Sequence, residues 1–392
     1  KGKIVKEWFG RTLIHSDRRF AYEDAQVLIE HEGPSEDPYE PVIKDLNRIA
    51  KTFRDARFKH GSVNFDSTEL RFLLDEDGKP IAVYPRERKD AHKLIEEFML
   101  LANKKVAEYV HELKPTDPRN TMVYRIHEAP DPEKLRVFSS FAKKFGYQVT
   151  TEPKQVSQSF NALMENIQGK AEENVLQSLA VRTMSKAKYS TDAIGHFGLA
   201  FPFYSHFTSP IRRYPDVMTH RLLQHYLDGG ETKDRSPIEI QCKHSSDREK
   251  LASEAERASI KYKQVEYMSL HEPQVFDGII TGVTEFGIFV EIGDTSCEGL
   301  VRMVDLNDDF YDLDKENYRI VGKSNGRVFT FGDAVKVKVR DTNLAKRTID
   351  LEMVGMRSGG GFANNRSRKR ESPRGNRVIP KGNERRRNTG RR

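Results

Sequence analysis

The chain has 392 residues, of which 36% are apolar and 32% charged, so it is long enough for two or three domains with a buried core. No apolar run approaches the roughly 18 residues of a membrane span, and the first residues show no secretory signal. We therefore expect no membrane partner and a cytoplasmic location. Two cysteines, Cys242 and Cys297, are too few for a disulfide framework or a cysteine zinc site, and they indicate a reducing compartment.

Apolar spacing predicts the elements of the N-terminal part. Residues 3–14 have a β-like pattern with no cap or turn before it, which is typical of a piece cut from a longer protein. Helical spacing follows over 22–30 and over 42–61, where the final glycine marks a stop. An Asp-Gly turn between two apolar runs predicts a hairpin over 70–84, and the longest helix is expected over 92–113.

The middle of the chain carries the most informative segment, at 196–216. Several helices are expected within 132–187, and two more at 216–228 and at about 238–268. The segment combines His-Phe-Gly-Leu at 196–199 with Ser-His-Phe-Thr-Ser-Pro-Ile-Arg-Arg-Tyr-Pro-Asp at 205–216. Arginine forks suit phosphate oxygens, and flat rings suit stacked bases.

The Thr-Ser-Pro at 208–210 has the pattern of a helix cap followed by proline at the first helical position. That pattern would place Arg212 and Arg213 near a helix N-terminus, where anions are favoured. From these residues alone, a pocket that grips a phosphate and a buried aromatic loop with two surface arginines are equally supported.

The two strings at 196–199 and 205–216 resemble the signature of the ribonuclease II/ribonuclease R family, which contains processive, metal-dependent 3′-to-5′ exoribonucleases. Further matches run from the first residue to about residue 354. The resemblance implies that residues 1–272 are the C-terminal part of an RNB nuclease domain. In that family an aspartate cluster holds the metal, and no such pattern occurs before Arg212. We therefore expect Mg²⁺ as cofactor, with its ligands upstream of this chain and none within it.

The resemblance also implies roles for individual residues. Arg212 would be catalytic and stabilise charge on the scissile phosphate, and Arg213 would be a phosphate or structural partner. Phe65 would stack on the terminal bases, and Glu96 and Glu256 would accept hydrogen bonds from the 3′-terminal nucleotide. From the residues alone, an ordinary core position for the phenylalanine and solvated helix faces for the two glutamates are serious alternatives.

Four histidines, at 196, 206, 220 and 225, do not have the spacing of a helical zinc pair, because the last two are five residues apart. We expect His196 and His206 to shape the loop that they occupy, and we assign no metal role to any of the four.

From Val275 onward the pattern changes to short strands punctuated by glycine. Five strands are expected, at 276–283, 286–292, 299–303, 334–339 and 348–353. Five short strands in this length predict a small β-barrel of the OB type. The strings Gly-Val-Thr-Glu-Phe-Gly-Ile-Phe-Val at 282–290, Glu-Gly-Leu-Val at 298–301 and Gly-Asp-Ala-Val-Lys-Val at 332–337 resemble the S1-type RNA-binding domain, which we expect over residues 273–354.

Within this barrel Phe286, Phe289 and Phe310 are candidate platforms for bases. Arg302 stands where the resembled family often has histidine, and an arginine can still stack and bind phosphate. The acidic run over 305–314 lacks the spacing of a calcium loop, so we expect a solvated loop there.

Positive charge is concentrated at the C-terminal end. Residues 357–392 hold 13 Lys and Arg against 2 Glu, a net of +11, whereas the whole chain carries +7 and residues 1–356 therefore sum to −4. With few apolar residues beyond Gly355, we expect 355–392 to be a disordered, basic, low-complexity tail. Such a tail binds polyanions through counterion release, although a solubilising end is the alternative.

The sequence thus predicts an α+β chain made of a nuclease part, an S1-type barrel and a basic tail. The favoured function is RNA degradation, as part of a monomeric exoribonuclease that hydrolyses single-stranded RNA to nucleoside 5′-monophosphates. One alternative is a non-catalytic RNA-binding protein that uses only the barrel and tail, and another is a structural role for a degenerate nuclease half. The joint presence of Phe65, Glu96, Arg212 and Glu256 favours the nuclease, because a pure binding module needs none of them.

Overall fold

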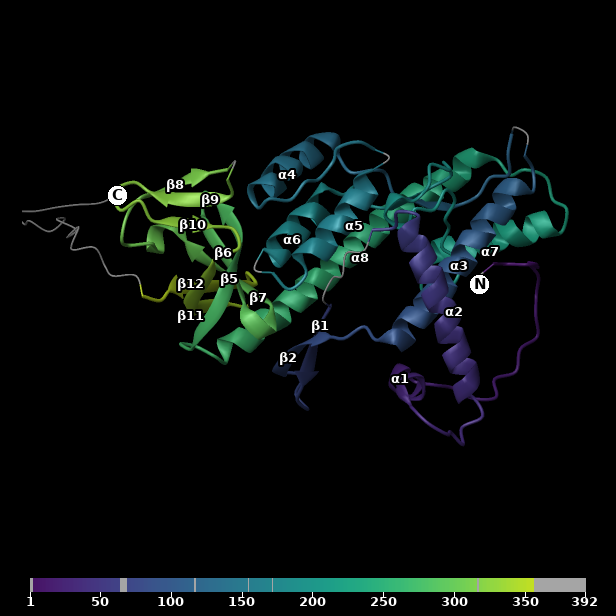
Figure 1. The fold of residues 1–392 in the computed structure, drawn as a ribbon, viewed down its shortest axis with the longest axis horizontal. Coiled ribbons are helices and arrows are strands. Elements are labelled where there is room, and N and C mark those ends of the chain that lie inside the picture. Colours follow the sequence, from purple (N-terminus) through teal and green to yellow (C-terminus); the bar gives the residue numbers. More distant parts are fainter. Residues whose placement is uncertain are drawn as a thin grey trace, which may run out of the picture.

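The computed structural model describes residues 3–63, 69–115, 118–153, 155–170, 172–315 and 317–355. Within them the fold is α+β, as predicted, and one long helix joins a helical part to a closed five-stranded barrel (Figure 1). The helices are α1 (Tyr22–Glu30), α2 (Glu40–Lys59), α3 (Asp90–Glu112), α4 (Pro132–Lys144), α5 (Val156–Ile167), α6 (Glu173–Thr183), α7 (Tyr214–Leu227) and α8 (Arg235–Ser269). The strands are β1 (Glu69–Leu74), β2 (Pro80–Arg86), β3 (Tyr124–Ile126), β4 (Lys188–Ser190), β5 (Val275–Thr284), β6 (Gly287–Ile292), β7 (Cys297–Arg302), β8 (Tyr311–Asp314), β9 (Arg319–Gly322), β10 (Val328–Thr330), β11 (Ala334–Asn343) and β12 (Thr348–Met353).

Helix α3 is the central helix of the N-terminal part. It packs against α1, α2 and α7, and the hairpin predicted near residue 77 forms as antiparallel β1 and β2. Buried side chains from α3, the β3–β4 pair and α7 make one core, which includes Val106, Met122, Tyr124 and Leu222. This core fixes the start of α7 relative to α3, and the loop over 196–213 lies between those two elements.

Helices α4, α5 and α6 form a second unit whose core is shared with the barrel. The rings of Phe138 and Phe160 stack at its centre with centroids 5.8 Å apart, and Phe331 from the barrel part joins the same cluster. Gly332 has a positive φ of 95°, and a Cβ there would lie 2.4 Å from a methyl group of Val175. Glycine at this position therefore lets the barrel approach the helices closely.

Helix α8 runs from the core around α7 to the barrel (Figure 1). Near its C-terminal end Gln264 Nε2 donates to the Ser296 carbonyl over 3.0 Å, and Val265 and Met268 are buried in the barrel core. The 35-residue helix therefore acts as a strut between the two parts.

The barrel closes in the order β11-β12-β7-β6-β5, with β11 paired to β5, and its five strands are those predicted. Three further strands, β8 to β10, form a separate sheet that the sequence reading missed. The expectation of a solvated loop over 305–314 is wrong for 311–314, which form β8, whereas 306–310 contain no helix or strand. On β8, Asp314 pairs with Arg319 of β9 and Asp312 with Lys323 just after it. The other face of this sheet is apolar, because Tyr311, Ile320 and Phe329 are buried in the barrel core. Strands of three or four residues are too short to show that face as a clear pattern in the sequence.

Two other expectations are wrong. Residues 3–14 form no strand, although Phe9 stacks on Tyr109 with centroids 4.4 Å apart. Helix α7 begins at Tyr214 with Pro215 in its first turn, whereas residues 210–212 make a turn before it, so Pro210 does not start the helix. Pro210 and Pro215, five residues apart, give competing start signals, and the contacts of the loop select the second.

Among the helices described, none is both long enough and apolar enough to cross a membrane. The expected disordered tail over 355–392 lies outside the described residues from Met356 onward.

Candidate functional site

The loop over 196–213 is anchored at its start by two histidines. Phe197 N donates to the His127 carbonyl over 2.8 Å, and Gly198 N donates to His127 Nδ1 over 3.1 Å. A Cβ at Gly198 would lie 3.1 Å from that same ring nitrogen, so a larger residue would push the His127 ring by a few tenths of an ångström. His196 caps the short turn that follows, with its Nδ1 accepting from Leu199 N over 3.3 Å.

The two predicted loop histidines are held neutral. Burial, with smaller contributions from His127 and Arg125, lowers the pKa of His196 to about 3. Burial, followed by the charges of Arg213 and Arg125, lowers the pKa of His206 to about 2. A hydrogen bond of 2.9 Å joins His206 Nδ1 to the Tyr189 hydroxyl. Neutral, bonded rings shape the loop, as predicted, and supply no charge for a phosphate.

The two adjacent arginines have different surroundings. Arg213 Nη2 donates to Asp216 Oδ1 over 2.8 Å, and Asp216, which is fully buried, also accepts from Ser209 N over 2.7 Å. Arg212 is exposed on the turn, where its backbone N donates to the Ser209 carbonyl over 3.3 Å, and its guanidinium makes no hydrogen bond or ion pair with the residues that the structure describes. Arg213 is therefore a structural cation within the chain, and Arg212 is free to bind an anion.

Three buried polar atoms near this ion pair have no hydrogen-bond partner among the described residues: Thr208 Oγ1, Arg213 Nε and Asp216 Oδ2. They lie within the segment that carries Arg212.

A buried asparagine that the sequence reading missed holds the middle of the loop. Asn103 Oδ1 accepts from Phe207 N over 2.9 Å and from Thr208 N over 3.1 Å, and its Nδ2 donates to the Tyr204 hydroxyl over 3.1 Å. The signal in the sequence was a polar residue in an apolar stripe of α3, between Leu100 and Ala107.

Glu96 and its neighbour Glu97 on α3 face different surroundings. Glu96 pairs with Arg88 over 2.6 Å and is partly exposed, so it can reach a ligand. Glu97 is 3% exposed and forms a two-pronged ion pair with Arg57 of α2. Arg57 Nη1 in turn donates to Ser62 Oγ over 2.7 Å.

The network continues to the loop. Ser62 Oγ donates to the Gly198 carbonyl over 3.0 Å, and Val63 N donates to the same carbonyl over 2.9 Å. Phe65 lies outside the described residues, which stop at Val63 and resume at Glu69. The chain that leads to Phe65 is thus tied to the first string of the signature.

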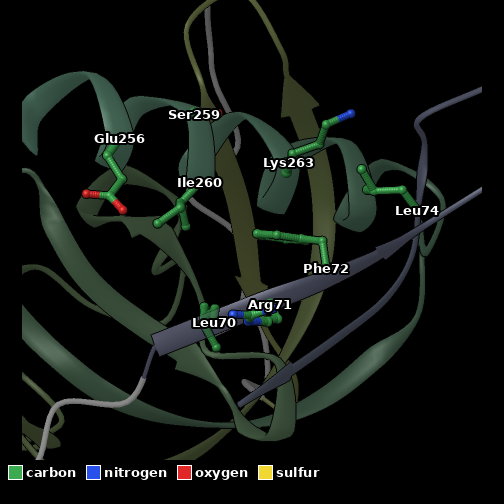
Figure 2. Close-up of a pocket in the computed structure, with 8 residues that line it drawn as sticks. All are labelled: Leu70, Arg71, Phe72, Leu74, Glu256, Ser259, Ile260 and Lys263. Atoms are coloured by element: carbon green, nitrogen blue, oxygen red, sulfur yellow. The ribbon is translucent and has the colours of Figure 1, made fainter. Parts of the chain in front are cut away.

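Glu256 lines a cavity of about 440 Å³ between β1 and α8. In Figure 2 the Phe72 side chain projects from β1 beneath the helix, with Glu256 at one end of the cavity and Leu74 at the other. Lys263 Nζ donates to the Gly78 carbonyl over 2.6 Å, which holds the hairpin against α8. The cavity has an apolar floor and a carboxylate at its edge.

Two of the three aromatics predicted for the barrel are exposed, but Phe310 directly precedes β8 of the separate sheet and only Phe286 lies on the barrel itself, between β5 and β6. Phe286 is 70% exposed and Phe310 is 72% exposed. Phe289 is half-buried against Gly282, and Arg302 Nε donates to Asp305 over 2.7 Å. Phe286 and Phe310 are therefore more accessible to a base than Phe289, and the Arg302 guanidinium already has Asp305 as a partner.

No group of three or more His, Cys, Asp or Glu side chains is placed to hold a metal ion within the described ranges. These residues do not by themselves fit a magnesium site, so the expectation of Mg²⁺ bound by ligands upstream stays a prediction.

Comparisons with known proteins agree with the two parts of the fold. Residues 1–229 match the RNB domain, and residues 270–354 match the S1 RNA binding domain. The chain is 38% identical over 350 residues to ribonuclease R of Aquifex aeolicus, covering 88% of this chain and 49% of the relative. It is 36% identical over 366 residues to ribonuclease R of Thermotoga maritima, covering 90% of this chain and 50% of the relative.

Among solved structures, Mycoplasma genitalium RNase R in complex with ribose methylated single-stranded RNA superposes with a TM-score of 0.79 at 24% identity. That match covers 86% of this chain and 53% of the other and shows a shared fold. The chain spans about half the length of the curated relatives it matches.

Proposed function

Since this chain belongs to the RNB domain family, we propose that it is the C-terminal part of a 3′-to-5′ exoribonuclease that hydrolyses single-stranded RNA to nucleoside 5′-monophosphates. We call that longer protein the parent nuclease. The observation that carries the proposal is Arg212, an exposed cation whose side chain has no partner among the described residues, on a loop whose backbone amides at 207–209 are held by Asn103 and Asp216. A free arginine fork on a fixed turn suits the phosphate whose charge changes during hydrolysis.

The remaining site residues fit an RNA 3′ end. Glu96 and Glu256 are accessible carboxylates that can accept hydrogen bonds from ribose hydroxyls or exocyclic amines. The apolar floor of the cavity beside Glu256 suits a base or ribose. Phe65 precedes β1, which lines this cavity, and would stack on the terminal bases without reading their identity. Arg213 would act on RNA only through the loop, because Asp216 holds it.

Hydrolysis of a phosphodiester needs an activated water, which a divalent metal can supply, and we assign this role to Mg²⁺ held by carboxylates upstream of Lys1. The division into a nuclease part over 1–272, a barrel over 273–354 and a tail over 355–392 belongs to the same proposal. So do a monomeric state and a cytoplasmic location.

The S1 barrel would bind the incoming strand. Phe286, on the barrel, and Phe310, beside the adjoining β8–β10 sheet, are exposed aromatic surfaces, and such platforms bind single strands without sequence preference. The ribonuclease R structure crystallised with single-stranded RNA supports this assignment, because it shares the fold.

The test measures release of mononucleotides from a labelled single-stranded RNA with Mg²⁺ present. We expect the parent nuclease to release them, its Arg212→Ala variant to release them far more slowly, and the 392-residue chain alone to bind RNA without turnover. Robust turnover by the 392-residue chain would contradict the upstream metal site. A parent protein with no nuclease activity would contradict the function.

A non-catalytic RNA-binding protein is the alternative function that a specific observation favours. The exposed Phe286 and Phe310 would serve a non-catalytic RNA-binding protein equally well. The same assay separates the two functions: if Phe310→Ala abolishes RNA binding and the parent protein never cleaves RNA, the chain is a binding module.

A further inference from the structure

Asn103 is 2% exposed, and both its amide oxygen and its amide nitrogen bond to the loop over 196–213. The oxygen accepts two consecutive backbone N–H groups, those of Phe207 and Thr208, and the nitrogen donates to Tyr204. A side-chain amide offers one acceptor oxygen with two lone pairs, so this oxygen is fully used.

The next amide along the loop is held as well. Ser209 N donates to Asp216 of α7, so three consecutive backbone amides are fixed by side chains of two different helices. His220 Nε2 donates to the Phe207 carbonyl over 2.9 Å, and the two rings stack with centroids 4.0 Å apart. The turn that carries Arg212 begins directly after these three amides.

Asn103 also relates this loop to the other end of the site. It lies seven residues after Glu96 on α3, which is two helical turns and about 10 Å along the axis, on the same face. Glu97 holds that part of α3 to α2 through Arg57. Helix α3 therefore carries both Glu96, whose carboxylate is proposed to contact the terminal nucleotide, and Asn103, whose amide holds the loop before Arg212.

The geometry points to Asn103 as a positioning residue that fixes the position of Arg212 relative to Glu96. Arg212 can then contact the scissile phosphate while Glu96 contacts the terminal nucleotide of the same RNA. This inference rests on the proposed function for its effect on rate, but its structural part does not. A displacement of about 1 Å at a catalytic group can cost roughly a hundredfold in rate.

The first experiment uses hydrogen exchange on the 392-residue chain and needs no activity. Asn103→Leu keeps the branched shape of the side chain and removes the acceptor, so exchange at the Phe207 and Thr208 amides should rise about tenfold or more. Asn103→Asp keeps an acceptor oxygen and should restore protection. Asn47→Leu removes another buried asparagine, on α2, and should leave both amides protected. Unchanged exchange at residues 207 and 208 in Asn103→Leu overturns the proposal. Should that variant not fold, Asn103→Ala takes its place with the same criterion.

The second experiment separates positioning from general stability in the parent nuclease. Asn103→Leu should lower the single-turnover rate about a hundredfold while RNA affinity changes by less than about threefold, and Asn103→Asp should recover most of the rate. Combined with Arg212→Ala, it should add little further loss, because its effect acts through that arginine. Losses that multiply in the double variant overturn the positioning role. An inactive parent with the expected exchange result would contradict the proposed function and leave the structural role of Asn103 established.

Discussion

The Arg57–Glu97 ion pair should be the largest single polar contribution to the stability of the site. The two side chains are 7% and 3% exposed, and the guanidinium meets the carboxylate through two nitrogens. Glu97→Ala would leave Arg57 buried with only Ser62 as a hydrogen-bond partner, and Arg54, 4.0 Å from the same carboxylate, would add repulsion. Removing one member of a buried ion pair costs about 3–5 kcal/mol, because the remaining charge is not compensated.

At about 2–4 °C per kcal/mol for a domain of this size, the midpoint of thermal unfolding should fall by about 6–20 °C. Calorimetry of the 392-residue chain measures it. The Arg57→Leu/Glu97→Leu variant should lose less than the sum of its single variants, by about 1–3 kcal/mol, since neither charge is left alone. Glu133→Ala, which removes a pair with Arg136 that is 70% exposed on both sides, is the control and should cost at most about 0.5 kcal/mol. If Glu97→Ala costs no more than that control, the reasoning is refuted.

Four more outcomes are expected. In the parent nuclease Arg212→Ala should lower the single-turnover rate about a hundred- to a thousandfold with much less effect on affinity, and Arg212→Lys should rescue it poorly; proportional losses of rate and affinity would make Arg212 a binding residue only. Removing residues 357–392 should flatten the slope of log affinity against log salt, and an unchanged slope would show that this segment does not bind RNA. Because the folded pKa values of His196 and His206 are depressed, to about 3 and about 2, the unfolded chain binds more protons than the folded chain below about pH 6.5. The free energy of unfolding should therefore fall between pH 7 and pH 5, at up to about 1.4 kcal/mol per pH unit for each histidine. The urea midpoint should fall more over this pH range in the wild type than in His206→Gln, and equal shifts in the two proteins would contradict the prediction. Phe310→Ala should weaken RNA binding by about 1–3 kcal/mol, measured by titration, whereas equal affinity would remove the ring from the binding surface.

The sequence was sufficient for elements with a strong periodic pattern. Helices α2, α3 and α8, the β1–β2 hairpin and the five barrel strands all lie where apolar spacing and turn residues predicted them. It failed for β8 to β10, because these strands of three or four residues are too short to show a clear apolar pattern, and their apolar side chains Tyr311, Ile320 and Phe329 find buried partners only in the barrel core. It failed for residues 3–14, whose β-like pattern meets no partner strand within the described residues.

What the sequence by itself determined about the site is its inventory: two adjacent arginines after a Thr-Ser-Pro turn, two glutamates on helices, and strings that match a nuclease family and an RNA-binding barrel. What only the tertiary structure decided is how those residues are used. Asp216 binds Arg213 and leaves Arg212 free, Arg57 buries Glu97 and leaves Glu96 accessible, and Asn103 reaches a loop about 100 residues away in sequence. The physical reason is that charge and hydrogen-bonding capacity belong to a residue, whereas their availability depends on which partners the fold brings within bonding distance.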